Sequence, residues 1–166
     1  MRRSEREITD QEALDGILQA ADLLFLAVRD EPAPYVFPVC FGSEGGTLYV
    51  HSALVGTKID LLRAHPDVGF CACTTVTITP ASMPCDYTSA ARSVVGTGRA
   101  RIVVDDEERV KGLDSIMRHY RTGAAGEYSY RPSSLARTCV IAIHVDTLHG
   151  KVTGDPPAVE PSHSPE

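Results

Sequence analysis

Short β-rich runs joined by tight turns are the feature that most limits the possible folds of this chain. The runs LLFLAVR (residues 23–29), YVFPVCFG (35–42) and TLYVHS (47–52) are separated only by DEPAP and SEGG. Parallel strands need a crossover of a dozen or more residues, whereas antiparallel strands can be joined by turns this short. The first third of the chain is therefore predicted to form an antiparallel meander.

Three further runs rich in β-branched residues follow: DVGFCACTTVTI (67–78), RSVVGTGRARIVV (92–104) and ARTCVIAIHVDTL (136–148). Residues 79–90, between the first two, are too many for a hairpin turn and are predicted to line a ligand pocket or cross to another subunit. Six strands with few helices predict a mainly β fold of the α+β class, a six-stranded antiparallel barrel with peripheral helices.

Three segments show helical patterns. TDQEALDGILQAA (9–21) opens with Thr9 and Glu12 at capping-box spacing, and residues 59–66 form a short amphipathic segment that ends at a proline. DDEERVKGLDSIMRHY (105–120) has acids in its first turn and His119 near its basic end. We expect one domain over residues 1–151, followed by a Pro-rich, disordered tail over residues 152–166.

Charge and composition restrict the classes of partner. The chain has 16 Lys and Arg against 22 Asp and Glu, which argues against nucleic acid or an anionic membrane as a partner. The N-terminus is charged, and no stretch is apolar over the length of a membrane span. Five cysteines at irregular spacing do not make a disulfide framework. We therefore expect a cytoplasmic protein that acts on a small molecule.

The stretch YVHSALVGTKIDLLRAHP (49–66) passes from a strand to a helix through a short loop. Backbone N–H groups at the start of a helix attract anions, and here Thr57 adds a hydroxyl and Lys58 a positive charge. The turn can therefore hold a terminal phosphate. Alternatively, Gly56 turns the chain, Thr57 caps the helix and Lys58 is solvated, because Gly-Thr-Lys lacks the rest of a P-loop.

His51, at the end of the third strand, has three possible roles. It can hydrogen-bond a cofactor, ligate iron or satisfy a neighbouring carbonyl. Cys71 and Cys73 share one face of a strand, but no second pair of cysteines completes a zinc motif, so no metal site is predicted. These two cysteines, with Cys40 and Cys139, are interpreted as small core residues.

Side chains alone do not suggest hydrolytic chemistry, because no Ser/His/acid or Cys/His arrangement can be identified from spacing. A cofactor would supply the missing chemistry. Flavin mononucleotide (FMN) fits, because it carries a terminal phosphate for Thr57 and Lys58 and a planar ring that strand backbone and aliphatic side chains can pack against.

Three stretches in order resemble the pyridoxamine 5'-phosphate oxidase-related flavin-binding split barrels, and within these the 5-nitroimidazole-resistance (Nim-like) branch. They are YVFPVCFGSEGGTLYVHSALVGTKIDLLRAHPDVGF (35–70), CDYTSAARSVVGTGRARIVVDDEERVKGLDSIMRHY (85–120) and LARTCVIAIHVDTLHGK (135–151). The resemblance extends from about residue 3 to residue 151. It implies a split β-barrel homodimer that binds two FMN molecules at the subunit interface.

The resemblance also implies which residues bind the cofactor. A strand whose backbone contacts the flavin ring runs from Phe37 to Phe41 and includes Pro38, Val39 and Cys40. Ribityl and phosphate contacts come from His51, Ser52, Ala53, Thr57 and Lys58. A third segment near the cofactor comprises Arg92, Ser93 and Val94. His51 matches a ligand-site histidine of Nim-like proteins, and some relatives bind haem there.

The chain also departs from this pattern. Ala91 precedes Ser93 where the branch often has an aromatic residue, which implies a wider pocket or a less covered flavin face. The basic substrate-phosphate residues and the C-terminal segment of true pyridoxamine 5'-phosphate oxidases have no counterpart, so we do not expect oxidation of vitamin B6.

We therefore expect an FMN-dependent oxidoreductase that reduces nitroaromatic or other electron-poor small molecules, with NADH or NADPH as electron donor. His51 is the candidate catalytic residue, orienting the acceptor or donating a proton. The alternatives are a haem-binding or haem-sensing protein with His51 as axial ligand, and a binding module without turnover.

Overall fold

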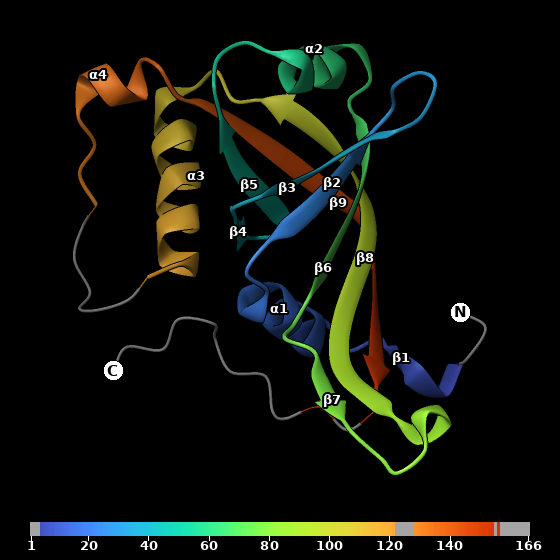
Figure 1. Ribbon diagram of the computed structural model, residues 1–166. Helices are drawn as coiled ribbons and strands as arrows, with labels where there is room; N and C mark the ends of the chain where they lie inside the picture. The colour runs from blue at the N-terminus through green and yellow to red at the C-terminus, as the bar shows by residue number, and fades with distance from the viewer. Residues whose placement is uncertain (1–3, 122–127, 155, 157–166) are drawn as a thin grey trace.

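The β-rich runs form one antiparallel sheet that curls into a barrel (Figure 1). The computed structural model describes residues 4–121, 128–154 and 156. The sheet follows the order β3-β2-β6-β8-β9-β5-β4, with β1 beside β9 and β7 beside β8. The strands are β1 (Glu7–Ile8), β2 (Leu24–Val28), β3 (Tyr35–Val39), β4 (Phe41–Glu44), β5 (Thr47–Ser52), β6 (Asp67–Cys73), β7 (Thr77–Thr79), β8 (Thr88–Ile102) and β9 (Cys139–Thr153).

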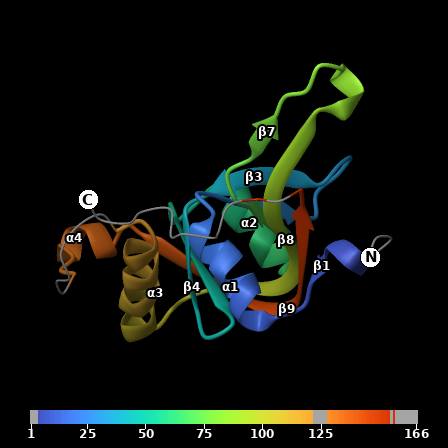
Figure 2. The same ribbon diagram turned by 90° about the horizontal axis from the view of Figure 1, so that it is seen from below.

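Helices lie at the ends and on one side of the barrel (Figures 1 and 2). They are η1 (Ser4–Arg6), α1 (Gln11–Ala20), α2 (Thr57–Ala64), η2 (Pro84–Asp86), α3 (Asp106–His119) and α4 (Pro132–Leu135). The side chain of Asp105 caps α3 by accepting the Glu108 N–H. Asp10 rather than Thr9 caps α1, by accepting the Ala13 N–H. None of the described helices is long and apolar enough to cross a bilayer.

The mainly β, antiparallel class is confirmed, but the described residues form nine strands rather than six. The run 35–42 divides at Cys40, because β3 pairs with β2 whereas β4 pairs with β5. The chain therefore crosses from one end of the sheet path to the other within one residue. Very short β1 and β7 are the other additions.

The excursion predicted at residues 79–90 begins earlier than its sequence indicated, because β6 ends at Cys73 and not at residue 78. Residues 77–79 pair with 88–90, so the segment is a hairpin that extends β8 rather than an open loop. Strand β9 likewise continues past the predicted end at residue 148 to Thr153. Val152 and Thr153 of the predicted tail thus complete β9, and most of the tail lies outside the described residues.

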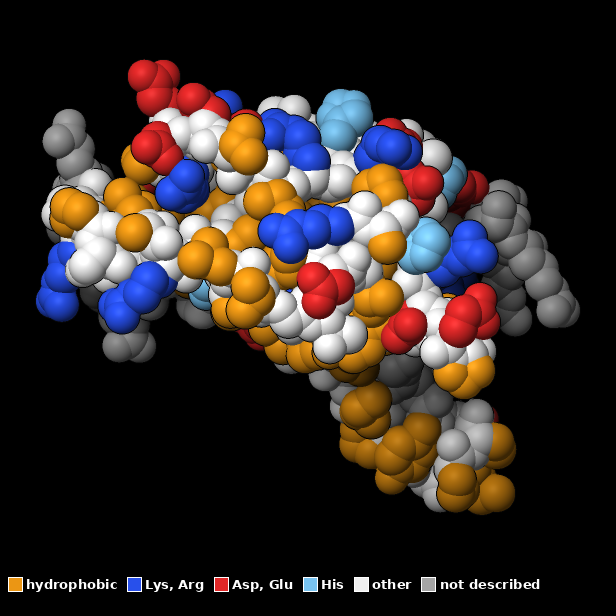
Figure 3. Space-filling view, turned by 90° about the horizontal axis from the view of Figure 1, so that it is seen from above, with side chains coloured by type: hydrophobic (Ala, Val, Ile, Leu, Met, Phe, Trp, Pro, Cys, Tyr) orange, Lys and Arg blue, Asp and Glu red, His pale blue; other side chains and the backbone are white. Residues whose placement is uncertain are grey.

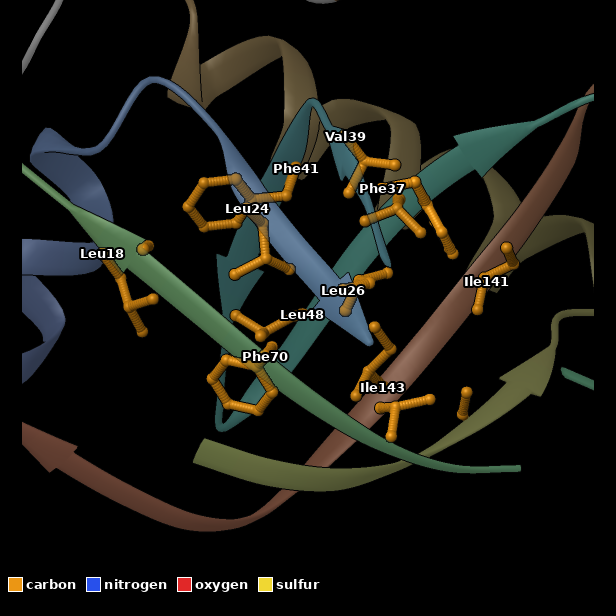
Figure 4. Close-up of a cluster of buried hydrophobic side chains, with 14 of the residues drawn as sticks. Leu18, Leu24, Leu26, Phe37, Val39, Phe41, Leu48, Phe70, Ile141 and Ile143 are labelled. Atoms are coloured by element: carbon orange, nitrogen blue, oxygen red, sulfur yellow. The ribbon is translucent and has the colours of Figure 1, made fainter. Parts of the chain in front are cut away.

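The core fills the barrel with side chains from strands distant in sequence (Figure 4). Leu26, Phe41, Leu48 and Ile143 are completely buried there, and α1 packs Ile17 into the same cluster. A second, smaller cluster lies where α3 covers the other face of β5 and β9, and comprises Tyr49, Val103, Ile116, Val140 and Ala142. Helix α3 is thus fixed to the outside of the barrel by its own apolar face.

Residues at the C-terminal end of α3 form hydrogen bonds to the loop before β2. His119 is only 3% exposed, and its Nε2 lies 2.8 Å from the carbonyl oxygen of Ala21. The Tyr120 hydroxyl donates to the carbonyl oxygen of Asp22 at 2.7 Å and accepts the Phe41 N–H at 3.1 Å. His119, expected to suit the negative end of the helix dipole, is therefore part of a buried connection.

Replacing Tyr120 by phenylalanine should lower the free energy of unfolding by about 2 kcal/mol, because it leaves Phe41 N–H and Asp22 C=O without the hydroxyl. Burial raises the pKa of Tyr120 above its usual value of 10.0. The folded protein therefore favours the neutral phenol. The contribution of Tyr120 to the free energy of unfolding is fully present below pH 10 and is lost progressively as the pH rises above 10. Urea unfolding at pH 7 and at about pH 11 should show the difference between wild type and Tyr120→Phe shrinking at the higher pH. Tyr87→Phe, an exposed control, should change stability by less than about 0.5 kcal/mol at pH 7.

Candidate functional site

The connection from β5 to α2 has a geometry that requires glycine. Gly56 precedes α2 with φ 127° and ψ 166°, a region of backbone space that is essentially restricted to glycine. The first helical hydrogen bonds run from the Ile59 and Asp60 N–H groups to Gly56 O, at 2.9 and 3.1 Å. The N–H groups of Thr57 and Lys58 therefore lie at the start of the helix, where no intrahelical acceptor exists. The alternative in which Thr57 caps the helix is wrong, because Gly56 is the cap residue and makes no side-chain cap.

Lys58 connects the start of α2 to β3. Its Nζ lies 4.6 Å from the centroid of the Phe37 ring, within the range of a cation–π contact. None of the ion pairs found among the described residues involves Lys58. The half-buried lysine therefore keeps a positive charge beside β3 without a carboxylate to neutralise it.

Strand β3 stands at one end of the sheet path, and within the described residues it pairs only with β2. Its other edge offers backbone N–H and C=O groups, and Pro38 suits an edge because it has no N–H to pair. Pro38 and Cys40 are exposed, whereas the side chains of Val39 and Phe41 are buried. A ligand could meet Val39 only through its backbone, and the Phe41 N–H is already engaged by Tyr120.

His51 is exposed at the end of β5. It shares a face of the strand with Tyr49, whose side chain packs under α3, and it stands opposite Val140 of β9. Among the described residues His51 makes no hydrogen bond, so the interpretation that it satisfies a neighbouring carbonyl is not supported. Its imidazole is accessible to a ligand.

Ser52 and Ala53 complete the strand end. Ser52 pairs with Cys139, the first residue of β9, and Ala53 begins the exposed connection to α2. Burial raises the pKa of the Cys139 thiol, an effect that Arg63 and Arg109 partly oppose. The thiol next to this strand end is therefore protonated at neutral pH and is not a nucleophile.

Arg92, Ser93 and Val94 lie at the opposite end of the barrel from His51. Strand β9 pairs with both segments: Cys139 stands opposite Ser52, and Val152 stands opposite Arg92. At about 3.3 Å per residue these pairs are roughly 40 Å apart along β9. In Figure 1, α2 lies at the top, whereas β7, which pairs with residues 88–90 of β8, lies at the bottom. One chain thus brings together the start of α2, the end of β5 and β3, but not the segment 92–94.

The interpretation of the cysteines as core residues is right for Cys139 and wrong for Cys40, Cys71 and Cys73, which are exposed. On β6 the larger side chains of Val68 and Phe70 point inward with Ala72, so alternation places both cysteines outside. The thiol of Cys71 is nevertheless partly desolvated, and this desolvation and the neighbouring Cys73 raise its pKa. Among the described residues no group of three or more His, Cys, Asp or Glu side chains is placed to hold a metal ion.

A surface cavity of about 390 Å³ lies between α2 and the end of β8. Its lining consists of Leu62, Arg63, Pro66, Ala100, Arg101, Ile102 and Val104. None of these residues belongs to the predicted site. The predicted residues instead lie largely on the exposed surface of one chain, around the β3 edge and the start of α2.

Sequence reasoning missed two side-chain contacts that shape the site. Phe37 positions Lys58, and Tyr120 takes the Phe41 N–H. For the contact between Phe37 and Lys58 there was no local signal, because only the placement of α2 over the barrel brings the ring and the ammonium together. For Tyr120 there was none, because it follows Phe41 by 79 residues and only the packing of α3 on β4 brings the two together.

Comparisons with known proteins agree with this architecture. The family model described as pyridoxamine 5'-phosphate oxidase matches residues 10–152. The crystal structure of a proposed 5-nitroimidazole antibiotic resistance protein from Bacteroides thetaiotaomicron is 32% identical, with a TM-score of 0.77 over 89% of this chain and 87% of that chain.

Two structures of lower identity share the fold. The flavocytochrome Anf3 from Azotobacter vinelandii is 22% identical, with a TM-score of 0.79 over 96% of this chain and 75% of that chain. An FAD- and haem-binding protein from Mycobacterium smegmatis is also 22% identical, with a TM-score of 0.77 over 92% and 76%. A Rhizobium meliloti (strain 1021) protein is 34% identical over 61 residues, which are 37% of this chain and only 40% of that relative.

Proposed function

The chain belongs to the pyridoxamine 5'-phosphate oxidase family, and we propose that it is an FMN-dependent oxidoreductase whose cofactor site is completed by a second copy of the chain. The observation that carries the proposal is the contact between Lys58 and Phe37. It joins an anion-attracting helix start to an open strand edge, which are the two surfaces that a phosphorylated planar cofactor needs.

Different residues of this chain would contact the phosphate, the ring and the ribityl chain of the cofactor. The N–H groups of Thr57 and Lys58, the Thr57 hydroxyl and the Lys58 ammonium hold the phosphate. The β3 edge from Pro38 to Cys40 holds the ring through backbone groups, and His51, Ser52 and Ala53 lie along the ribityl chain. Bound FMN supplies electron transfer from NADH or NADPH to an electron-poor acceptor.

The separation between His51 and Arg92 supports a site formed by two copies. The two residues pair with opposite ends of β9, so Arg92, Ser93 and Val94 of one chain can join the site only in a homodimer, where they come from the second copy. The similarity to the Bacteroides protein favours nitroaromatic compounds as the class of acceptor.

An absorption spectrum of the purified protein tests the proposal directly. We expect flavin bands, retained on dilution and strengthened by added FMN, and NADH or NADPH consumption on addition of a nitroaromatic acceptor. Replacing His51 by alanine should slow acceptor reduction while leaving FMN bound. A colourless protein that takes up no added FMN would contradict the proposal.

Haem binding is the second candidate, favoured by the exposed, unengaged His51 and by the two structural relatives named for haem or cytochrome. In that case the protein should show a Soret band that disappears in His51→Ala. His144→Ala is the matched control, since His144 is exposed on β9 opposite Thr47 and Arg99, away from both the end of β5 and the segment 92–94, and its loss should leave the band intact. A Soret band that survives His51→Ala would remove His51 as the axial ligand.

A further inference from the structure

The surface cavity between α2 and the end of β8 is not used by the proposed cofactor site. Its volume is about 390 Å³. Figure 3 shows this end of the molecule, where Lys and Arg side chains lie among hydrophobic ones. Sites for small molecules commonly measure about 300–1,000 Å³ and combine mainly apolar walls with a few polar groups. The cavity therefore has the size and the composition of a small-molecule site.

The walls of the cavity are fixed to each other by the backbone. The Ala100 N–H of β8 donates a hydrogen bond of 2.8 Å to the carbonyl oxygen of Pro66, which follows α2. Leu62 and Ala100 are each only 4% exposed and belong to the main core cluster. The cavity is thus part of the folded barrel and does not have to be ordered when a ligand enters, which lowers the entropic cost of binding.

Most of the lining is apolar. Five of the seven lining residues have apolar side chains, and only Arg63 and Arg101 are polar. Val104 forms part of the rim, since its side chain is 84% exposed, more than any other large apolar side chain in the described part of the chain. A ligand with an apolar body would remove this side chain from water, which favours binding.

The two arginines differ in how firmly they are engaged. Arg101 pairs with the Glu108 carboxylate of α3. Arg63 lies 3.9 Å from Asp60, at the limit of an ion pair, and both of these side chains are more than half exposed. Such surface pairs contribute little free energy, whereas an anion held in the cavity could accept two hydrogen bonds from the guanidinium. The Arg63 guanidinium is therefore the polar group available to a ligand.

The charge around Arg63 favours an anion. Within the described residues, no Asp or Glu lines the cavity. Arg63 lies in the last turn of α2, where the helix dipole places a partial charge of about −0.5, and a full positive charge outweighs it. Arg63 also acts on the neighbouring buried thiol of Cys139, because with Arg109 it opposes the rise in pKa that burial causes there.

We propose that this cavity binds a small organic monocarboxylate, with its carboxylate paired to Arg63 and its apolar body against Leu62, Ile102 and Val104. One available guanidinium matches one negative charge. Its planar set of N–H donors also matches the two oxygens of a carboxylate.

This site is separate from the proposed cofactor site, although both use α2. Arg63 follows Lys58 by five residues, which places the two side chains about 140° apart around an axis with 3.6 residues per turn. Lys58 faces the Phe37 ring of β3. Arg63 faces the end of β8, where it lines the cavity with Arg101. A carboxylate at Arg63 therefore leaves the phosphate position at the start of α2 free.

The test is calorimetric titration with phenylbutyrate, an aromatic monocarboxylate, and with its neutral amide. We expect phenylbutyrate to bind at one site per chain and the amide, which has the same apolar body, to bind at least about tenfold more weakly. Arg63→Ala should weaken phenylbutyrate binding by a similar factor. Arg118→Ala is the matched control, because Arg118 is a comparably exposed arginine that pairs with Glu44, outside the cavity, and its loss should leave the affinity unchanged.

Val104 allows a second test with effects of opposite sign. Val104→Asp places a negative charge at the rim and should weaken phenylbutyrate binding, whereas Val104→Lys should strengthen it. Because Val104 is so exposed, neither substitution should alter the fold, which circular dichroism checks. Equal affinities in these two variants would contradict the proposed place of the carboxylate.

Three results would overturn the proposal: no saturable binding of phenylbutyrate, equal binding of its amide, or an unchanged affinity in Arg63→Ala. Repeating the titration on FMN-saturated protein distinguishes the two sites. We expect the same affinity with and without FMN, and displacement of FMN by phenylbutyrate would exclude a separate site. A colourless protein that binds phenylbutyrate through Arg63 would support this inference and contradict the proposed function.

Discussion

Replacing Gly42 by alanine should lower the free energy of unfolding by about 3 kcal/mol and the melting temperature by roughly 10 °C. Gly42 lies on β4 directly beneath α3. A Cβ there would fall 2.5 Å from the Ile116 backbone nitrogen and similarly close to the Ser115 backbone, which is nearer than real Cβ atoms approach. The atoms it meets belong to a helix backbone and cannot rotate away, so α3 would have to move off the sheet.

Gly69→Ala is the matched control for this prediction. A Cβ at Gly69, on β6, would meet only the Ala27 Cβ, at 4.0 Å. Its free energy of unfolding should stay within about 0.5 kcal/mol of wild type in urea or thermal melts. If Gly42→Ala behaves like Gly69→Ala, α3 does not pack on β4 as described.

Lys58→Ala should weaken FMN binding by about 10- to 100-fold, which corresponds to about 1.5–3 kcal/mol for a charge-assisted hydrogen bond to phosphate. Folding should be nearly unaffected, because the contact between Lys58 and Phe37 contributes at most about 1 kcal/mol at a partly exposed site. Titration of FMN followed by its fluorescence measures the affinity, and Lys58→Arg should retain most of it because the positive charge remains.

Two controls show whether the loss is specific to the phosphate. Riboflavin has the same ring without the phosphate, so its affinity should be the same for wild type and Lys58→Ala. Lys111→Ala removes a lysine of α3 that pairs with Glu44 at 3.5 Å, and it should bind FMN as wild type does. An FMN affinity within twofold of wild type in Lys58→Ala would remove Lys58 from the site.

Much of the fold could be predicted because its signals are local. Helix α3 follows from a capping aspartate, an acidic first turn and apolar residues at helical spacing, and it begins and ends within one residue of the segment expected. The short turns after β2 and β4 correctly indicated antiparallel pairing. Local signals failed where pairing partners decide the boundary, as at Cys40, where one continuous β-rich run belongs to two distant positions in the sheet.

The candidate site likewise has features that the sequence could predict and features that it could not. The Gly-Thr-Lys turn could be identified as an anion-attracting helix start because all of its groups lie within a few residues. The outward position of Cys71 and Cys73 could also have been predicted, since Val68 and Phe70 occupy the alternate positions of the same strand. The proximity of Lys58 to Phe37 could not, because it depends on how α2 is placed over the barrel.

The sequence by itself determined the β-rich class and the strand-to-helix turn at Gly56, and it set residues 79–90 apart as a long excursion between two strands. These features depend on backbone preferences and on the spacing of neighbouring side chains. Only the tertiary structure decided that His51 and Arg92 pair with opposite ends of β9, and that residues 77–79 and 88–90 pair as a hairpin. Strand register is set by contacts between residues about 50 positions apart, as between β8 and β9, and no local pattern contains that information.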